Sequence, residues 1–197
     1  GNTYTFKVTD EKGCTYNENL TIPLSTPIGV VGQLISNVSC VNGSDGEIRY
    51  TVSGFITNYN YTVVDASNTE VQSSATPQTN SIIDITGLEA GVYTITVTDP
   101  QTDCTDTDTV TIEEPTSQLV LGTPDITHES CSPTGTNLGA ITISASGGWG
   151  SFTYELYGGA GNLITSNGTG SFSNLSAGDY IIQVIDANEC DIDSTTI

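Results

Sequence analysis

The feature that most constrains this sequence is an internal repeat. The stretch Gly87–Cys104 recurs at Asn174–Cys190, with Leu, Gly and Tyr at the same spacing and a Cys at the end. Its second half appears once more at Thr3–Cys14. Each copy has the pattern of a turn, a strand and a Cys-bearing loop, and consecutive copies of the Cys lie about 90 residues apart. A fixed period of this kind predicts an array of like-built modules.

Charge and hydropathy exclude several classes of partner. The formal net charge is −20, from 23 acidic and 3 basic residues. Lys7, Lys12 and Arg49 cannot neutralise a phosphate backbone, so we expect no nucleic acid partner. Apolar runs are far shorter than the roughly 20 residues that cross a bilayer, so no membrane span is expected in this segment. The sequence has no Met and opens on no leader-like pattern, and we expect it to be an internal piece of a longer protein.

Short alternating segments predict an all-β fold. Thr, Val, Ile and Tyr suit pleated, half-buried surfaces, and Gly, Asn, Asp and Ser supply turns between them. Seven such segments fill residues 27–116, their order repeats in 117–197, and no segment has a helical period. This spacing is typical of immunoglobulin-like sandwiches. The strands predicted in the first unit lie near 29–38, 47–53, 59–65, 69–74, 81–85, 92–98 and 107–113.

The repeat also predicts the domain organisation. Residues 1–26 are expected to be the C-terminal strands of a preceding repeat, and 27–116 a complete immunoglobulin-like repeat. Residues 117–197 are expected to be another such repeat with its last strand truncated. Tyr93 and Tyr180 match the tyrosine corner, in which the hydroxyl bonds to nearby backbone at the start of strand F. Short Pro-marked linkers favour tandem sandwiches in an extended rod.

The motifs of the first unit resemble the SprB repeat of giant surface adhesins in gliding Bacteroidota. The resemblance rests on Val38-Ser39-Cys40-x-Asn42-Gly43-Ser44-Asp45-Gly46, on Tyr59-x-Tyr61, and on Gly87–Asp99 followed by Cys104. It covers both full units and the N-terminal tail. The second unit departs from the pattern, because Glu129–Thr134 replaces the Cys-x-Asn-Gly signature. The resemblance implies export by the type IX route, an extracellular position at the cell surface, and a role in adhesion or gliding.

The five cysteines are expected to form structural disulfides, because none belongs to a C-x-x-C and oxidised cysteine suits an exported protein. They are Cys14, Cys40, Cys104, Cys131 and Cys190. Two arrangements are open. Pairing within each repeat gives Cys40–Cys104 and Cys131–Cys190, although an immunoglobulin order places those loops at opposite ends of a sandwich, too far apart for a disulfide. Pairing across the junction gives Cys40–Cys190 and leaves the other three for neighbouring repeats.

Aspartates near the F–G loops form a candidate Ca²⁺ site at a domain end, since Ca²⁺ takes six to eight oxygen ligands. No cofactor is otherwise required. The alternative is a solvated acidic loop, which the lack of an EF-hand or nonapeptide motif favours. The candidate ligands are Asp99, Asp103, Asp106, Asp108, Asp186, Asp191 and Asp193.

Three further features have a functional and a structural interpretation. Trp149, the one Trp of the chain, lies in a predicted B–C loop and could stack on a sugar or pack at the rim or the domain junction. Thr109 and Ser194 each follow an Asp at matching places, as in the O-glycosylation acceptor of Bacteroidota, or belong to ordinary strand G sequence. The lone His128 lacks a nucleophile and an orienting acid at compatible places, so we expect no catalytic role for it.

These observations predict a non-catalytic protein. The expected function is that of a stalk segment of a large bacterial surface adhesin, with neighbouring repeats, surface polysaccharide or another cell-surface protein as partners. The alternative is a carbohydrate-binding or accessory module of a secreted polysaccharide-degrading enzyme. An enzyme is disfavoured, because repeated sequence argues against one unique active site.

Overall fold

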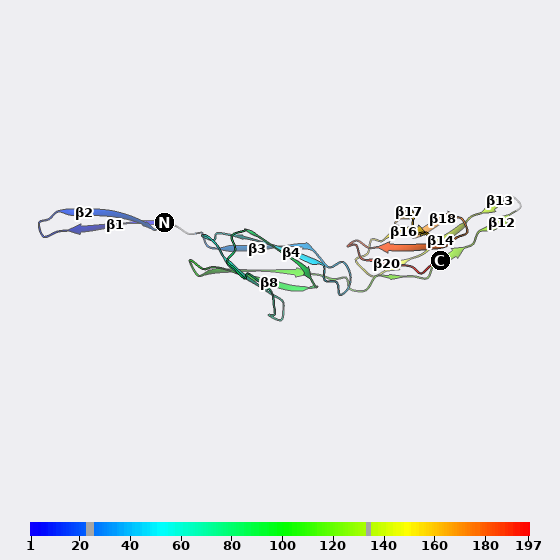
Figure 1. Cartoon of the computed structure of the whole chain (residues 1–197), viewed down its shortest axis with the longest axis horizontal. Helices are drawn as coiled ribbons and strands as arrows, with labels where there is room; N and C mark the ends of the chain where they lie inside the picture. The colour runs from blue at the N-terminus through cyan, green and yellow to red at the C-terminus, as the bar shows by residue number, and fades with distance from the viewer. Residues whose placement is uncertain (23–25, 133–134) are drawn as a thin grey trace. The chain divides into compact units, whose positions relative to one another are not determined.

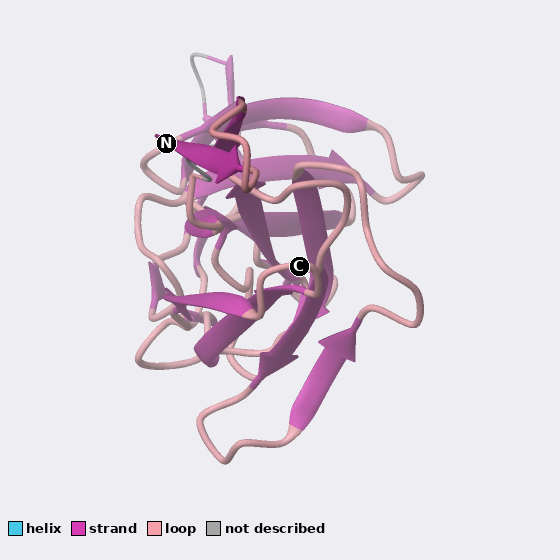
Figure 2. Cartoon of the chain, turned by 90° about the vertical axis from the view of Figure 1, so that its left-hand side faces the viewer, coloured by secondary structure: helices cyan, strands magenta, loops and turns pink. Residues whose placement is uncertain are grey.

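The computed structural model describes residues 1–22, 26–132 and 135–197, with side chains described outside 131–137. Every regular element in these ranges is a β-strand, and none is a helix, as Figure 2 shows. The predicted all-β class is therefore confirmed. The chain divides into two compact units. One comprises Gly1–Gln33, Arg49–Asp84 and Val92–Val110, and the other Leu34–Ile48, Ile85–Gly91 and Thr111–Ile197.

The N-terminal residues form a hairpin of two strands, β1 (Asn2–Thr9) and β2 (Thr15–Ile22). Its register pairs Tyr4 with Leu20 and Val8 with Tyr16, so these four apolar side chains lie on one face. All four are more than half exposed. A hairpin of this kind is marginally stable by itself in water.

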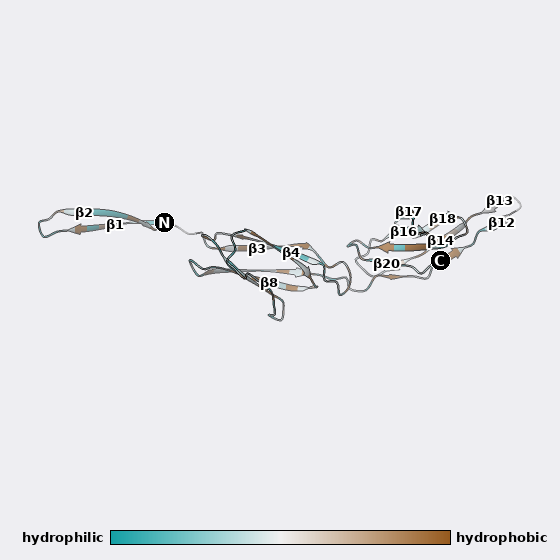
Figure 3. Ribbon diagram, viewed as in Figure 1, coloured by the Kyte–Doolittle hydropathy of each residue, from teal (hydrophilic) through white to brown (hydrophobic). Residues whose placement is uncertain are grey.

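Seven strands follow in two sheets (Figure 1). The strands carry both hydrophilic and hydrophobic residues (Figure 3), and burial alternates along β4 and β8, so one face of each sheet supplies the core. Tyr50 is fully buried, and its hydroxyl donates to the carbonyl of Tyr93 at 3.3 Å. The first sheet has the order β3 (Gly29–Ser36), β4 (Gly46–Ser53), β7 (Ile82–Leu88), and the second β6 (Glu70–Ser73), β5 (Asn60–Val64), β8 (Gly91–Asp99), β9 (Cys104–Ile112).

Two aspartates of β9 join it to β3, a strand of the other sheet. Asp106 Oδ2 accepts the backbone N–H of Val30 at 2.9 Å, and Asp108 Oδ2 accepts that of Gly32 at 2.7 Å. A strand edge carries N–H groups that need acceptors. These carboxylates supply them and connect the two sheets along one side.

The strands of residues 117–197 repeat this plan. Their core contains Ile141, Tyr154, Leu156, Phe172 and Ile182 among others. The sheets have the orders β11 (Asp125–Thr127), β14 (Gly139–Thr142), β18 (Ser171–Leu175) and β17 (Leu163–Asn167), β16 (Thr153–Gly158), β19 (Tyr180–Ile185), β20 (Asp191–Asp193). The short pairs β10 (Val120–Leu121) with β15 (Ala145–Ser146) and β12 (Ser130–Ser132) with β13 (Gly135–Asn137) complete the described strands.

The predicted strands agree with the observed ones to within a few residues. The hydroxyl of Tyr180 donates to the carbonyl of Ser176 at 2.8 Å, which is the hydrogen bond of a tyrosine corner. Within the described ranges each sheet takes all its strands from one of the segments 1–26, 27–116 and 117–197. The domain boundaries at 26/27 and 116/117 remain a prediction.

Two glycines at matching places fix how each repeat starts. Gly54 and Gly147 have φ values of 76° and 80°. A Cβ at Gly54 would collide with the backbone of Pro27, and one at Gly147 with the backbone of Gln118. Glycine therefore permits both the left-handed turn after the strand and the close approach of the entering chain.

We predict that Gly147→Ala lowers the free energy of unfolding by about 2–4 kcal/mol, because strained φ and backbone overlap add. Gly161→Ala is the matched control, since Gly161 has φ 81° and nothing within 4 Å of a Cβ built there. The control should cost about 1 kcal/mol. Urea unfolding of both variants measures the difference, and equal losses would contradict the role assigned to Gly147.

Candidate functional site

The loop between β19 and β20 is built on one buried carboxylate. Asp186 is 6% exposed, and its Oδ1 accepts the backbone N–H of Asn188 at 2.9 Å and of Cys190 at 3.1 Å. The Asp186 N–H in turn donates to the Cys190 carbonyl at 2.9 Å. A buried carboxylate is stable when backbone donors satisfy it. Asp186 therefore fixes where the loop presents Cys190.

The second oxygen of the same carboxylate positions Trp149. Asp186 Oδ2 accepts the backbone N–H of Trp149 at 2.7 Å. The half-buried indole then donates from Nε1 to the carbonyl of Val38 at 2.9 Å. Trp149 and Val38 belong to the same compact unit, which contains both residues 34–48 and residues 111–197. One face of the Trp149 environment is thus supplied by a segment about a hundred residues earlier in the chain.

The segment that receives Trp149 is a loop held by its own hydrogen bonds. Val38 is fully buried, and its N–H donates to the carbonyl of Glu113 at 3.3 Å. Asp45 Oδ1 accepts the N–H of Ser39 at 3.0 Å, and hydrogen bonds from Ser39 hold the pKa of Asp45 below its usual value. Asn42, at φ 58°, donates its N–H to Glu114 Oε2 at 2.9 Å.

A disulfide joins these two loops. Cys40 and Cys190 are bonded with a Cα–Cα distance of 5.2 Å and a sequence separation of 150 residues. Of the two arrangements open from the sequence, the structure therefore contains the Cys40–Cys190 bond. Cys14 and Cys104 are free and exposed. Cys131 lies in β12, in the stretch whose side chains are outside the description.

The structure places the candidate Ca²⁺ ligands in separate hydrogen-bond roles. Asp99 is 1% exposed and accepts the N–H groups of Ile56 and Gln101 at 2.9 and 2.8 Å. Asp106 and Asp108 bond to β3, as described above. Asp103 donates its N–H to the Asp99 carbonyl, Asp191 accepts from Gln183, and Asp193 is exposed. Among the described residues no three His, Cys, Asp or Glu side chains are grouped to hold a metal. Ca²⁺ binding remains a prediction.

The two candidate glycosylation residues differ in exposure. Thr109 is exposed on β9, and its hydroxyl lies 3.2 Å from that of Thr94. Ser194 is half-buried, and its hydroxyl oxygen accepts the N–H of Ile182 at 2.9 Å. A glycan on Ser194 would have to displace this bond, whereas Thr109 is open. Modification at both residues remains a prediction.

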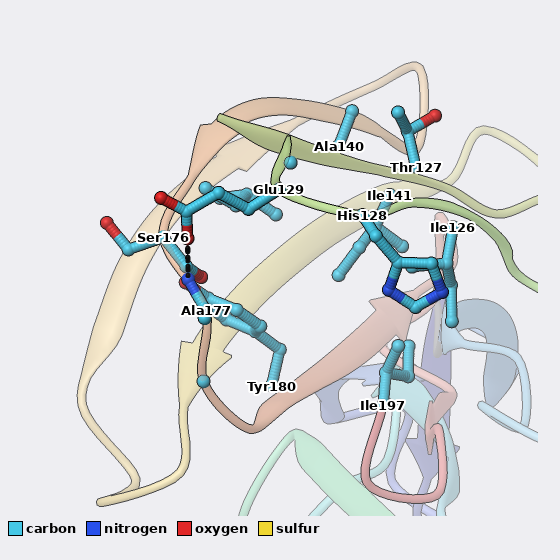
Figure 4. A pocket seen from close by; sticks show the side chains of 13 residues that line it. Ile126, Thr127, His128, Glu129, Ala140, Ile141, Ser176, Ala177, Tyr180 and Ile197 are labelled. Atoms are coloured by element: carbon cyan, nitrogen blue, oxygen red, sulfur yellow. Dashed lines mark hydrogen bonds between the residues drawn. The ribbon is translucent and has the colours of Figure 1, made fainter. Parts of the chain in front are cut away.

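His128 lines an open pocket of about 310 Å³ within residues 126–197 (Figure 4). Its imidazole lies near Ile126 and Ile197. The Glu129 carboxylate points away from the imidazole, and its Oε2 accepts the N–H of Ala177 at 3.0 Å. The pocket is lined mainly by aliphatic side chains and backbone.

Sequence reasoning missed Val38, Ser39 and Glu114 as parts of the site. A signal for Val38 was present, because the two units differ at this place. The first unit has the apolar Val38, whereas the second has the charged Glu129. The role of Val38 depends on an indole from another part of the fold, which the sequence does not place. Trp149 was singled out, and the structure shows its indole donating to the carbonyl of Val38.

The geometry defines a class of protein: immunoglobulin-like β-modules whose loops are joined by a buried carboxylate, an indole hydrogen bond and a disulfide. The family model described as the SprB repeat matches residues 33–68 and 123–161, which contain the Cys40 loop and Trp149. Two segments of the chain therefore match the SprB repeat. The chain is an adhesin-type extracellular repeat module, and its disulfide fits an extracellular protein.

Two solved structures illustrate distant likenesses to this chain. Three N-terminal domains of the Hoc capsid protein of bacteriophage RB49 are 13% identical over 85% of this chain, with a TM-score of 0.44, and the chain spans 57% of their length. The C-terminal intimin fragment solved with the intimin-binding domain of its translocated receptor is 18% identical, covering 85% of this chain and 62% of that one, at a TM-score of 0.46. TM-scores below 0.5 establish no relationship. No curated protein matches the sequence.

The described residues include no helix with the length and apolar character needed to cross a bilayer.

We predict that Cys190→Ser lowers the free energy of unfolding of residues 111–197 by about 2–4 kcal/mol, because the disulfide restricts the unfolded chain. The fluorescence of Trp149, the one Trp present, reports this transition in urea. Cys104→Ser is the matched control, since Cys104 is a free thiol where the corresponding loop meets β9. An equal urea midpoint for Cys190→Ser and the parent chain would contradict the prediction.

A second prediction concerns Asp45. In the folded protein its pKa lies below the ordinary 3.8, with hydrogen bonds from the Ser39 hydroxyl and N–H as the main causes. A lowered folded-state pKa stabilises the fold above the unfolded value, and this stabilisation is lost as the pH falls through the folded pKa. Ser39→Ala should raise the pKa of Asp45 toward 3.8, as measured by carboxyl-carbon NMR titration. The pKa of Asp65, which depends on Ser67 and Thr69, should stay unchanged.

Proposed function

We propose that this chain is a non-catalytic, load-bearing spacer segment of a large bacterial surface adhesin. In this role it is exported by the type IX route, lies extracellularly at the cell surface, and serves adhesion or gliding. Its partners are neighbouring repeats of the same protein, with surface polysaccharide or another cell-surface protein at sites that the whole adhesin presents. Repeated modules suit such a role because many weak contacts add up to high avidity.

The observation that carries the proposal is the Cys40–Cys190 disulfide. Cys40 lies in the loop between β3 and β4, and Cys190 in the loop between β19 and β20, so the bond joins two repeat segments covalently. A force applied at the two ends of the chain would pass through this bond. The 150 residues that it spans would then carry no tension. A disulfide that protects most of the chain from tension is useful in a spacer and has no evident use in a binding module.

The environment of Trp149 supports the same conclusion. A sugar-binding Trp presents a free ring face and usually a polar group beside it. Here the indole is half-buried, and its N–H donates to Val38 within the chain. The alternative function is a carbohydrate-binding or accessory module of a polysaccharide-degrading enzyme. In that role, Trp149 would have to bind a sugar while its N–H is bonded to Val38, or after this bond is broken.

Single-molecule stretching between Gly1 and Ile197 tests the proposal. Reduction should add about 500 Å to the fully extended length, because about 150 residues at 3.3–3.6 Å each become free to extend. Cys190→Ser without reductant should give the same length as the reduced parent chain. An oxidised chain that extends as far as the reduced one would overturn the load-bearing role.

A glycan array is the complementary measurement. A spacer segment should bind no glycan, and Trp149→Ala should change nothing in that assay. Glycan binding that Trp149→Ala abolishes would favour the carbohydrate-binding alternative instead.

A further inference from the structure

Residues 27–112 contain a corner that resembles the one around Cys190, and its cysteine, Cys104, is free among the described residues. In the Cys190 corner, the buried Asp186 accepts the backbone N–H of Trp149 at 2.7 Å. In the other, the buried Asp99 accepts the backbone N–H of Ile56 at 2.9 Å. Ile56 therefore stands in the place of Trp149. Cys104, at the end of the loop that Asp99 begins, stands in the place of Cys190, although its N–H donates to Thr102 Oγ1 at 3.3 Å rather than to the aspartate.

The two corners differ in what covers them. Cys190 is 7% exposed and bonded to Cys40, and the Trp149 indole is half-buried against Val38. Cys104 is an exposed free thiol, and Ile56 is 56% exposed. The corner around Asp99 thus also has an apolar side chain, Ile56, and a cysteine, Cys104, and both are exposed to solvent. The Cys190 corner shows which segment covers such a corner: the loop that contains Val38 and Cys40.

The N-terminal hairpin carries a loop with the same hydrogen bonds as the Cys190 loop. Asp10 Oδ1 accepts the N–H groups of Lys12 and Cys14 at 2.9 and 2.8 Å, and the Asp10 N–H donates to the Cys14 carbonyl. These are the hydrogen bonds that Asp186 makes with Asn188 and Cys190. Cys14 is also free and exposed. The loop is therefore a recurring means of presenting a thiol, and only the copy that faces the Cys40 loop has its thiol oxidised in the described chain.

We propose that Ile56 and Cys104 form a docking surface for the Cys40-type loop of the preceding SprB repeat, sealed by a disulfide between Cys104 and the cysteine of that loop. The direction follows from this chain, in which the cysteine of a later segment, Cys190, bonds to that of an earlier loop, Cys40. Ile56 packs against the residue that corresponds to Val38. The inference rests on the proposed spacer function. It adds to that function by naming the loop of the preceding repeat that each cysteine corner binds.

The oxidation is a pair of thiol–disulfide exchanges. The Cys104 thiolate attacks a small-molecule or oxidoreductase disulfide, forms a mixed disulfide and releases one thiolate. The partner cysteine thiolate then attacks the Cys104 sulfur and releases the second thiolate. The oxidant disulfide accepts two electrons and, with the two protons from the cysteines, ends as two thiols.

The test duplicates residues 27–116 in place, so that the full chain gains one more copy of its first repeat. The longer chain is refolded with oxidised and reduced glutathione, and its disulfides are mapped without reduction. We expect Cys40 of the first copy to be bonded to Cys104 of the second, and Cys40 of the second copy to Cys190. Cys104 of the first copy should stay reactive to maleimide. A Cys40–Cys104 bond within one copy, or free Cys104 in the second copy, would overturn the proposal.

Variants of the second copy separate docking from chance oxidation. Ile56→Asp should lower the rate of the new bond about tenfold, because it places a charge in the apolar contact. Val31→Asp, at a 67% exposed position on β3, is the matched control and should leave the rate unchanged. Equal rates for the two variants would show that Ile56 does not contribute to docking.

The retained Cys40–Cys190 bond serves as the folding control. Should the direct duplication fail to fold, a Gly/Ser linker of about ten residues between the copies removes strain at the new junction and leaves the expected bond within reach. The result is independent of the stretching experiment, which reads only the Cys40–Cys190 bond. Failure of this proposal would therefore leave the spacer function intact.

Discussion

The buried carboxylate at the start of each F–G loop is the interaction on which the rest of the structure depends. A charge withdrawn from water is costly unless donors surround it. Asp99 and Asp186 meet this requirement with backbone N–H groups from two loops at once. Each therefore fixes its own loop and also positions the residue at the tip of another, Ile56 or Trp149. The placement of the indole and of Cys190 follows from this one anchoring point.

The fold could be predicted because its determinants are local. Alternation along residues 47–53 and 92–98 specifies which side chains face the core, and the observed burial of β4 and β8 follows it. Because the sequence repeats, the strands assigned in one unit supported the strand assignment of the other. The tyrosine corner was also predictable, because Tyr180 bonds to a carbonyl four residues away. Features of this kind need no knowledge of what lies across the molecule.

The site could be predicted only in part, because its determinants are distant in sequence. Topology left two cysteine arrangements open, and the choice depends on where the loops after β3 and β19 lie in space. The acidic residues were grouped as Ca²⁺ candidates from their spacing along the chain. In the structure Asp106 and Asp108 bond to the amides of β3, some 76 residues earlier. Spacing along a strand could not show that partner.

The acidic composition follows from the same use of carboxylates. With 23 acidic and 3 basic residues, ion pairs can satisfy few of the carboxylates. Hydrogen bonds to backbone N–H groups are charge-assisted and need no cation. Asp186 in a loop, Asp106 along a sheet edge, and Glu129 at a pocket rim each accept such a bond. The negative charge is thus built into turns and edges, where it stabilises the backbone, while the rest remains on the surface and favours solubility.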